Sequence, residues 1–352
     1  MDSIPNRHNN MAVGLDCGTS FYIAAREDSI KKQRNAFLTV DGEANQAKRM
    51  LKRQRIPYVE KANKVHIVGQ HAFNYAQIFS TAQLRRPMKS GLLNPEERDS
   101  LPVLNAIVGE LVGKAKEGET CVYCIPAKPI DQERETSYHE DVLKTIIDSY
   151  GYNTKVIEEA VALGYEGLVD NNLTGISISM GAGMCNVAVM YQGMTAVSFS
   201  VARGGDWVDQ NVSADTGVAV AKVQNIKESS NLLDLTKSKV IDIYEEESED
   251  ANVIHAIRSY YGALITYLLT NLKAQFEGTA NVPQFQEPVP LIFGGGTALV
   301  KGLLDVVNEQ FDQENFPIQV SEITIIEDSH TAVSRGCLSE AQIIEEEENE
   351  TD

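Results

Sequence analysis

The sequence predicts an α/β protein made of two similar halves, on three observations. Residues 175–180 and 187–190 read as two apolar strands, with Gly181, Ala182 and Gly183 as the turn between them. Residues 11–25 repeat this strand–turn–strand pattern. A third apolar strand, 289–293, runs into three glycines and a helix start. A single turn of this kind is often only a hairpin. Three glycine turns whose N–H groups can face phosphate predict one nucleotide bound between two lobes.

Composition excludes several classes of protein. Charged residues make up 23% of the chain and hydrophobic residues 43%, as in soluble globular proteins. No apolar run approaches the roughly 18 residues that cross a bilayer, and no signal-peptide pattern is present, so we expect a cytoplasmic protein. The net charge of −19 argues against general nucleic-acid binding, because it repels the phosphate backbone. We expect disordered ends at 1–10 and at the acidic 343–352.

The first half reads as lobe I, residues 11–158, with an outer subdomain at about 31–90. Its expected helices cover 46–55, 71–79, 100–116 and 132–150, and its later strands cover 65–68, 120–125 and 154–157. Residues 120–125 are continuously apolar, which is typical of a strand buried on both faces. The 46–55 helix carries a basic cluster, which is usually a solvated face but could contact an acidic neighbour: Lys48, Arg49, Lys52, Arg53 and Arg55.

The second half reads as lobe II, residues 159–325, and again alternates helices with strands. Its expected helices cover 159–168, 218–229, 251–276 and 298–311, with one more opening at Gly204, and its later strands cover 193–202 and 318–326. The 251–276 helix has an apolar stripe at helical spacing. The segment 326–342 is expected to be a helix that packs back on lobe I.

The five cysteines are scattered, and only Cys121 and Cys124 have a metal-like spacing. Residues three apart on a strand point to opposite faces, so joint zinc ligation is disfavoured. We therefore expect buried free thiols.

Several motifs resemble those of the actin, sugar kinase and heat-shock chaperone ATPase superfamily, most closely its MreB and MamK-type bacterial and archaeal filament proteins. They are Asp16-Cys-Gly-Thr-Ser20, Arg86-Pro-Met-Lys-Ser-Gly91, Ile125–Arg134 with its Glu-Arg pair, Ile157-Glu-Glu-Ala-Val-Ala162, Gly204–Asp209, Ile226-Lys-Glu228 and Gly294-Gly-Gly-Thr297. The similarity spans residues 11 to about 342. It implies an actin-like ATPase fold of two duplicated α/β lobes with a nucleotide cleft between them.

The resemblance also implies a site for ATP and Mg2+. Asp16 would hold the metal, and Glu133 would orient the attacking water. Without the family resemblance, Glu133 reads as an acidic residue in the first turn of a helix, where it favours the helix N-terminus. The implied nucleotide-binding residues are Asp16, Gly18, Thr19, Ser20, Gly181, Ala182, Gly183, Gly204, Gly205, Asp206, Lys227, Glu228, Gly294, Gly295, Gly296 and Thr297.

The second turn departs from the family pattern. Ser179 stands where relatives carry the aspartate that begins this loop, Met184 and Cys185 replace two threonines, and Asn186 replaces a later aspartate. A missing carboxylate near the metal and the water predicts slow hydrolysis, while nucleotide binding is retained.

The resemblance implies a filament-forming cytoskeletal protein, which polymerises with itself and whose nucleotide state controls assembly. A role in cell shape would follow for an MreB-like protein. Alternatives are a non-hydrolysing nucleotide-binding scaffold and, with less support, a chaperone-type or sugar-kinase-type ATPase. No membrane-anchoring helix is evident in residues 1–10, and adaptor proteins cannot be named.

Overall fold

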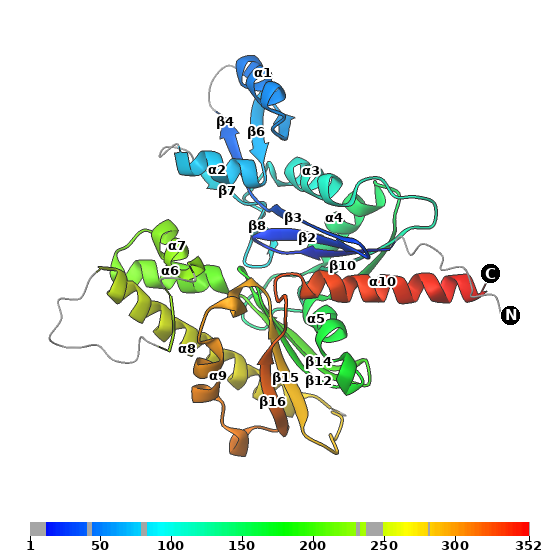
Figure 1. Ribbon diagram of the computed structural model, residues 1–352, viewed down its shortest axis with the longest axis vertical. Coiled ribbons are helices and arrows are strands. Elements are labelled where there is room, and N and C mark those ends of the chain that lie inside the picture. Colours follow the sequence, from blue (N-terminus) through cyan, green and yellow to red (C-terminus); the bar gives the residue numbers. More distant parts are fainter. Residues whose placement is uncertain are drawn as a thin grey trace. The chain divides into compact units, whose positions relative to one another are not determined.

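The computed structural model describes residues 12–40, 44–78, 83–229, 233–236, 249–280 and 282–351. These residues form two compact units (Figure 1). Unit 1 holds the described residues up to Ile125, Glu135–Glu158 and those from Ser334 onward, and unit 2 holds Pro126–Arg134 and Glu159–Val333. The expected disorder at 1–10 lies outside the described residues.

Unit 1 is built on a five-stranded sheet in the order β11-β10-β1-β2-β3. Its strands are β1 (Val13–Cys17), β2 (Phe21–Arg26), β3 (Ser29–Arg34), β10 (Thr120–Ile125) and β11 (Asn153–Glu158). β1 pairs antiparallel with β2 and parallel with β10. Helices α3 (Ser100–Val112) and α4 (Ser137–Asp148) lie on one face and α10 (Ala332–Thr351) on the other. Every residue of β10 is therefore buried, as its apolar run predicted.

Unit 2 repeats this topology in a second five-stranded sheet, β14-β13-β12-β15-β16. Its strands are β12 (Gly175–Met180), β13 (Cys185–Tyr191), β14 (Met194–Val201), β15 (Val289–Gly294) and β16 (Val320–Ile325). β12 pairs antiparallel with β13 and parallel with β15, as β1 does with β2 and β10. The predicted fold class, two duplicated α/β halves, is confirmed.

Alternation along β12 divides its side chains between two layers. Ile176, Ile178 and Met180 enter a core shared with helices α6 to α9. The hydroxyls of Ser177 and Ser179 instead meet α5, on the opposite face. These helices are α5 (Glu159–Gly167), α6 (Gly205–Thr216), α7 (Val220–Glu228), α8 (Glu249–Gly278) and α9 (Leu303–Gln310), with 3₁₀ turns at Val169–Asn171, Gly296–Leu299 and Gln313–Asn315.

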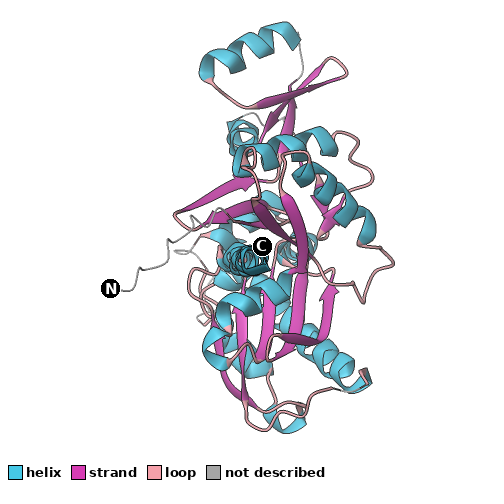
Figure 2. Cartoon of the chain, turned by 90° about the vertical axis from the view of Figure 1, so that its right-hand side faces the viewer, coloured by secondary structure: helices cyan, strands magenta, loops and turns pink. Residues whose placement is uncertain are grey.

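A small outer sheet, β5-β6-β4-β7, extends unit 1 at one end (Figure 2). Its strands are β4 (Phe37–Val40), β5 (Tyr58–Lys61), β6 (Lys64–Val68) and β7 (Leu84–Arg85), and it carries α1 (Ala44–Gln54) and α2 (Gln70–Ile78). A separate core holds it together, with Leu38, Leu51 and Ile67 at its centre. The hairpin of β8 (Met88–Lys89) and β9 (Leu92–Leu93) follows.

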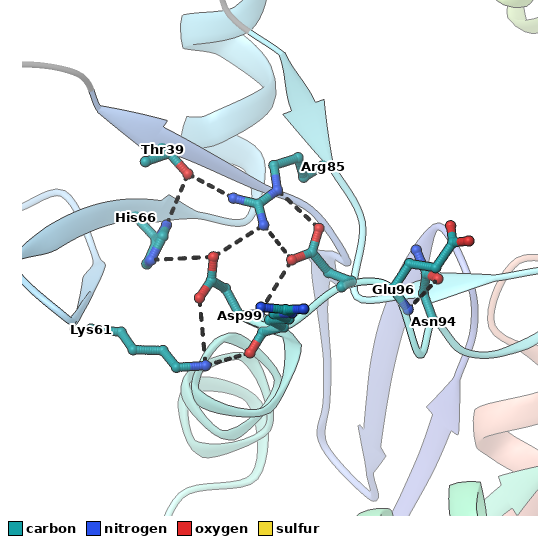
Figure 3. A network of polar contacts seen from close by, with 9 residues as sticks. Thr39, Lys61, His66, Arg85, Asn94, Glu96 and Asp99 are labelled. Carbon is teal, nitrogen blue, oxygen red and sulfur yellow. Dashed lines mark hydrogen bonds and ion pairs between the residues drawn. The ribbon is translucent and has the colours of Figure 1, made fainter.

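Arg85 anchors this outer sheet to the start of α3 (Figure 3). Its guanidinium donates to both carboxylate oxygens of Glu97, to Asp99 Oδ2 at 3.0 Å and to Thr39 Oγ1 at 2.9 Å. Lys61 adds an ion pair to Asp99 at 3.4 Å. A planar guanidinium suits such multiple contacts better than an ammonium would.

The imidazole of His66 lies fully buried beside this cluster. Its Nδ1 is 3.1 Å from Thr39 Oγ1, while its Nε2 faces Asp99 Oδ2 at 3.9 Å and forms no hydrogen bond there. Burial lowers the pKa of His66, and the nearby Arg85 and Lys64 cations act in the same direction against the pull of Asp99.

The acidic C-terminal segment differs from its prediction. α10 continues through the expected disordered residues as far as Thr351. Its buried face includes Leu338, Ala341 and Glu345, and Glu345 Oε1 accepts a hydrogen bond of 2.9 Å from the Thr120 N–H. A run of glutamates is acidic but also strongly helix-forming, and here one of them is anchored to a strand. Among the described residues, no helix combines the length and apolarity that crossing a membrane requires.

Candidate functional site

The turn between β1 and β2 is held by hydrogen bonds from three directions. The Gly18 N–H donates to Phe21 O at 3.0 Å, and Asn35 Nδ2 donates to Gly18 O at 3.1 Å. The buried Thr19 hydroxyl accepts from the Gly91 N–H at 3.1 Å. The backbone of this first glycine turn is therefore fixed in one conformation, which the Arg86–Gly91 connector supports.

Two adjacent N–H groups in each hairpin turn have no acceptor within the described part of the chain. They belong to Thr19 and Ser20 in unit 1, and to Ala182 and Gly183 in unit 2. Consecutive unpaired N–H groups in a turn form a concave donor surface for an anion. The two turns occupy equivalent places in the duplicated sheets.

Asp16 is half-buried at the end of β1, next to the first turn. Loss of water around its carboxyl raises its pKa to about 7, although a hydrogen bond from Cys124 Sγ (3.6 Å) and the charge of Lys32 act against this. A carboxylate whose charge is so poorly solvated fits a role beside a cation. No set of three metal-ligating side chains occurs among the described residues.

All five cysteines are buried thiols outside any disulfide bond, as predicted. Cys124 donates to Asp16, so its thiol belongs to the surroundings of the first turn.

The second glycine turn joins two other predicted motifs within unit 2. Gly181 O accepts from the Gly205 N–H at 3.0 Å and from Thr297 Oγ1 at 2.9 Å, and Ala182 O accepts from the Asp206 N–H at 2.8 Å. The structure therefore brings the Gly181 turn, the start of α6 and the Gly294–Thr297 segment together. The N–H groups of Gly205 and Asp206 already have acceptors inside the protein.

Two glycines in this junction allow backbones to approach closely. A Cβ on Gly204 would lie 2.5 Å from Gly181 O, and one on Gly295 would lie 2.5 Å from Met180 O. Gly295 also has a φ of 87°, which side chains rarely adopt. Because neither glycine has a Cβ, the neighbouring backbone segments can pack directly against the second turn.

Lys227 is engaged inside unit 2. Its ammonium donates to Asp209 Oδ2 at 2.7 Å and to Gly205 O at 2.8 Å. Asp209 is buried, so its pKa is raised to about 6 even with Lys227 beside it. Glu228, by contrast, is exposed and accepts from Gln224. Lys227 thus ties α7 to the first turn of α6, while Glu228 lies open to solvent.

Glu159, the first residue of α5, is the centre of a polar cluster that motif matching did not assign. Ser179 Oγ donates to its Oε1 at 2.7 Å, and Asn186 Nδ2 donates to its Oε2 at 2.9 Å. Asn186 Oδ1 in turn accepts from the Ala127 N–H at 3.2 Å, which fixes the orientation of its amide. Two of the four residues that depart from the family pattern therefore hold one carboxylate between them.

A sequence signal for this cluster exists. Ser179 and Asn186 are polar residues in two mostly apolar strands, and the hairpin register pairs them directly. Glu159 lies in the Glu-Glu-Ala junction that the family comparison had singled out without assigning a role.

Glu133 lies exposed in the loop Pro126–Arg134. Its side chain makes no hydrogen bond or ion pair with the residues that the structure describes. The loop itself is anchored beside β14, where the Ala202 N–H donates to Asp131 Oδ1 at 2.8 Å and the Ile130 N–H donates to Ser200 O. Both Glu133 and Glu159 belong to unit 2.

Comparison with known proteins gives one family and several solved structures. A family model described as Volactin matches residues 11–341. The MamK double helical filament aligns with a TM-score of 0.72 at 17% identity, over 94% of this chain and 98% of that one. MreB 5 of Spiroplasma citri bound to AMPPNP aligns at 0.65 and 15%, over 97% and 98%, and the same protein bound to ADP at 0.61 and 15%, over 96% and 98%. No protein with a curated description matches. The expected actin-like fold of the MreB and MamK type is confirmed.

Proposed function

The chain belongs to the Volactin family, and from this premise we propose that it is an ATP-binding, filament-forming cytoskeletal protein of the actin-like fold. The observation that carries the nucleotide part is a pair of N–H groups in each of two equivalent glycine turns that have no acceptor within the described ranges. Solved structures of similar fold include an MreB bound to AMPPNP and to ADP and a MamK filament, which supports both parts of the proposal.

In this proposal the N–H groups of Thr19, Ser20, Ala182 and Gly183 bind the phosphates of ATP. Asp16 is the carboxylate that we propose as the partner of Mg2+. Bound Mg2+ would neutralise part of the phosphate charge. Gly18 shapes the first turn. The second turn is positioned by Gly204, Gly205, Asp206, Lys227 and Gly294–Thr297. In this proposal the same residues and the exposed Glu228 contact the rest of the nucleotide.

We assign the orientation of the attacking water to Glu159 ahead of Glu133. Two donors hold the Glu159 carboxylate, whereas the exposed Glu133 side chain makes no hydrogen bond or ion pair with the described residues. A general base has to be placed within hydrogen-bond reach of its water, so a held carboxylate suits the role better. Ser179 and Asn186 occupy part of the hydrogen-bonding capacity of this carboxylate, so we expect slow hydrolysis.

Co-sedimentation and phosphate release, measured on the same samples, test this proposal. We expect pelleting with ATP or AMPPNP and magnesium, loss of pelleting with ADP, and slow phosphate release. Pelleting with ATP but no phosphate release would favour the non-hydrolysing scaffold, which the serine at position 179 specifically supports. A protein that stays monomeric with every nucleotide would rule out the filament.

A further inference from the structure

A row of side chains crosses the sheet of unit 1 beside the first glycine turn. The strand register pairs Asp16 of β1 with Ile23 of β2, and Ile23 with Lys32 of β3, the last strand in the sheet order (Figure 1). Directly paired residues of neighbouring strands project from the same face of a sheet. Asp16, Ile23 and Lys32 therefore project from one face, and the row ends in an exposed lysine.

The ammonium of Lys32 lies next to the first turn. Its Nζ is 3.9 Å from the centroid of the Phe21 ring, and Phe21 is the residue that follows the turn. The Phe21 carbonyl closes the turn by accepting from the Gly18 N–H at 3.0 Å. Burial raises the pKa of Asp16, and the positive charge of Lys32 acts against this rise. The ring contact and the effect on Asp16 both place this cation at the turn.

A second cation of the same strand is held more firmly. Arg34 projects from the same face as Lys32, and its Cζ lies 4.5 Å from the ring centroid of Phe21 and 3.8 Å from that of Phe73. Its Nε also donates to Gln70 Oε1 at 3.3 Å. A lysine carries its charge on a flexible four-carbon chain, whereas a planar guanidinium stacked on two rings is fixed in place. Of the two, Lys32 is the cation that can move to meet a ligand.

A full positive charge is needed at this turn if it is to bind phosphate. The half-buried Asp16 lies beside the turn, and the whole chain carries a net charge of −19. Backbone N–H groups supply only partial positive charges. Hydrogen bonds between an ammonium and phosphate oxygens are charge-assisted and stronger. A polyphosphate next to this carboxyl group is therefore bound more tightly when an ammonium faces it as well.

We propose that Lys32 binds the terminal phosphates of ATP, together with the N–H groups of the first turn. This assignment rests on the proposed function, because it adds a side chain to the nucleotide site described there. On binding, the ammonium exchanges its contact with the Phe21 ring for a charge-assisted hydrogen bond to a phosphate oxygen. The ligand that Lys32 favours is thus a nucleoside di- or triphosphate over a monophosphate.

Nucleotide titration of the full-length protein with magnesium tests this assignment. Lys32→Gln should weaken ATP binding about tenfold or more and AMP binding less than about twofold, because the lost hydrogen bond goes to the terminal phosphates. Lys32→Arg keeps the charge and should stay within about threefold of wild type. The matched control is Lys31→Gln, which removes an exposed charge from the opposite face of the same strand and should leave ATP binding unchanged.

The salt dependence of binding distinguishes a charge from a structural role. The difference between wild type and Lys32→Gln should shrink as the salt concentration rises from about 0.1 M to about 1 M, because screening weakens the attraction between an exposed ammonium and phosphate. A difference that stays constant over this range would show that the substitution changes the shape of the turn.

The outcomes separate this assignment from the function on which it rests. If the wild type binds no ATP, the proposed function fails and the assignment with it. If the wild type binds ATP but Lys32→Gln matches Lys31→Gln, only the assignment is wrong. Equal losses of ATP and AMP binding in Lys32→Gln, or an equal loss in Lys32→Arg, would overturn it as well. Circular-dichroism melting establishes that each variant is folded.

Discussion

Ser179 and Asn186 stand where related proteins carry aspartates, but they serve as hydrogen-bond donors. From the sequence alone, they are two missing carboxylates beside the second turn. In the structure both donate to Glu159, at 2.7 and 2.9 Å. Aspartates in their places would be acceptors facing an acceptor, so the serine, the asparagine and the glutamate are consistent only as a set.

The first prediction separates the two candidate glutamates. Glu159→Gln should lower phosphate release about a hundredfold or more, as expected for loss of a general base. Glu133→Gln should change the rate less than about twofold, because its side chain is exposed and unpartnered among the described residues. Steady-state phosphate release measures both, with ATP binding as the control for each variant. A larger loss in Glu133→Gln would restore the assignment made from the motif.

A second prediction concerns Ser179→Asp. The new carboxylate would face Glu159 from a position that is 1% exposed, and two like charges there repel. We expect a lower unfolding temperature and slower phosphate release than in Ser179→Ala, which loses only one hydrogen bond, worth about 1 kcal/mol. Faster release by Ser179→Asp would instead show that the serine limits hydrolysis.

Asp16 gives a third prediction, in which stability and binding change in opposite directions. Its pKa of about 7 in the folded protein exceeds the ordinary 3.8, so the folded state binds more protons between these values. Nucleotide-free protein therefore loses stability as the pH rises through this window. Asp16→Asn should melt higher than wild type at about pH 8, with little difference at about pH 4, and should lose magnesium-dependent ATP binding. Equal melting at both pH values would contradict the burial argument.

At the scale of elements, the outer sheet depends on the cluster around Arg85 (Figure 3). Strand β7 contributes the arginine, β4 the threonine, β6 the histidine, and the segment leading into α3 both acids. The sheet is thus joined to α3 by polar contacts and by Phe37 and Val68, which enter the core of unit 1, while Leu38, Leu51 and Ile67 belong to the core of the sheet itself.

A fourth prediction follows from His66. Burial lowers its pKa in the folded protein, so the unfolded chain binds its proton more readily. Stability is therefore present above the ordinary value of 6.5 and is lost as the pH falls below it. His66→Gln should flatten the dependence of melting temperature on pH between about 5 and 7, measured against wild type in the same buffers. Parallel curves would show that the ring does not titrate in this range.

At the scale of the whole molecule, ligand binding should stabilise the fold. ATP with magnesium at about one hundred times its dissociation constant should add about 2.7 kcal/mol to the free energy of unfolding. Calorimetric melting with and without magnesium measures this, and Asp16→Asn supplies the control that should lose the magnesium-dependent part. An unchanged melting temperature would argue against nucleotide binding at the glycine turns.

The order of the elements, the duplication and the places of the glycine turns follow from the sequence alone, because strand alternation and apolar runs are local properties. The burial of 120–125 is of this kind. The acidic tail shows the limit of local reasoning. Its charge suggested disorder, but its helix propensity and the hydrogen bond that the Thr120 N–H donates to Glu345 keep it in α10.

Only the tertiary structure decided which polar groups are already in use. Glu159 is 20 residues from Ser179 and 27 from Asn186, and Lys227 is 18 from Asp209. The N–H groups of Gly205 and Asp206 are satisfied by the second turn, while those of Ala182 and Gly183 have no acceptor among the residues that the structure describes. A sequence motif identifies the donors and acceptors, but packing between distant segments determines which of them remain available for a ligand.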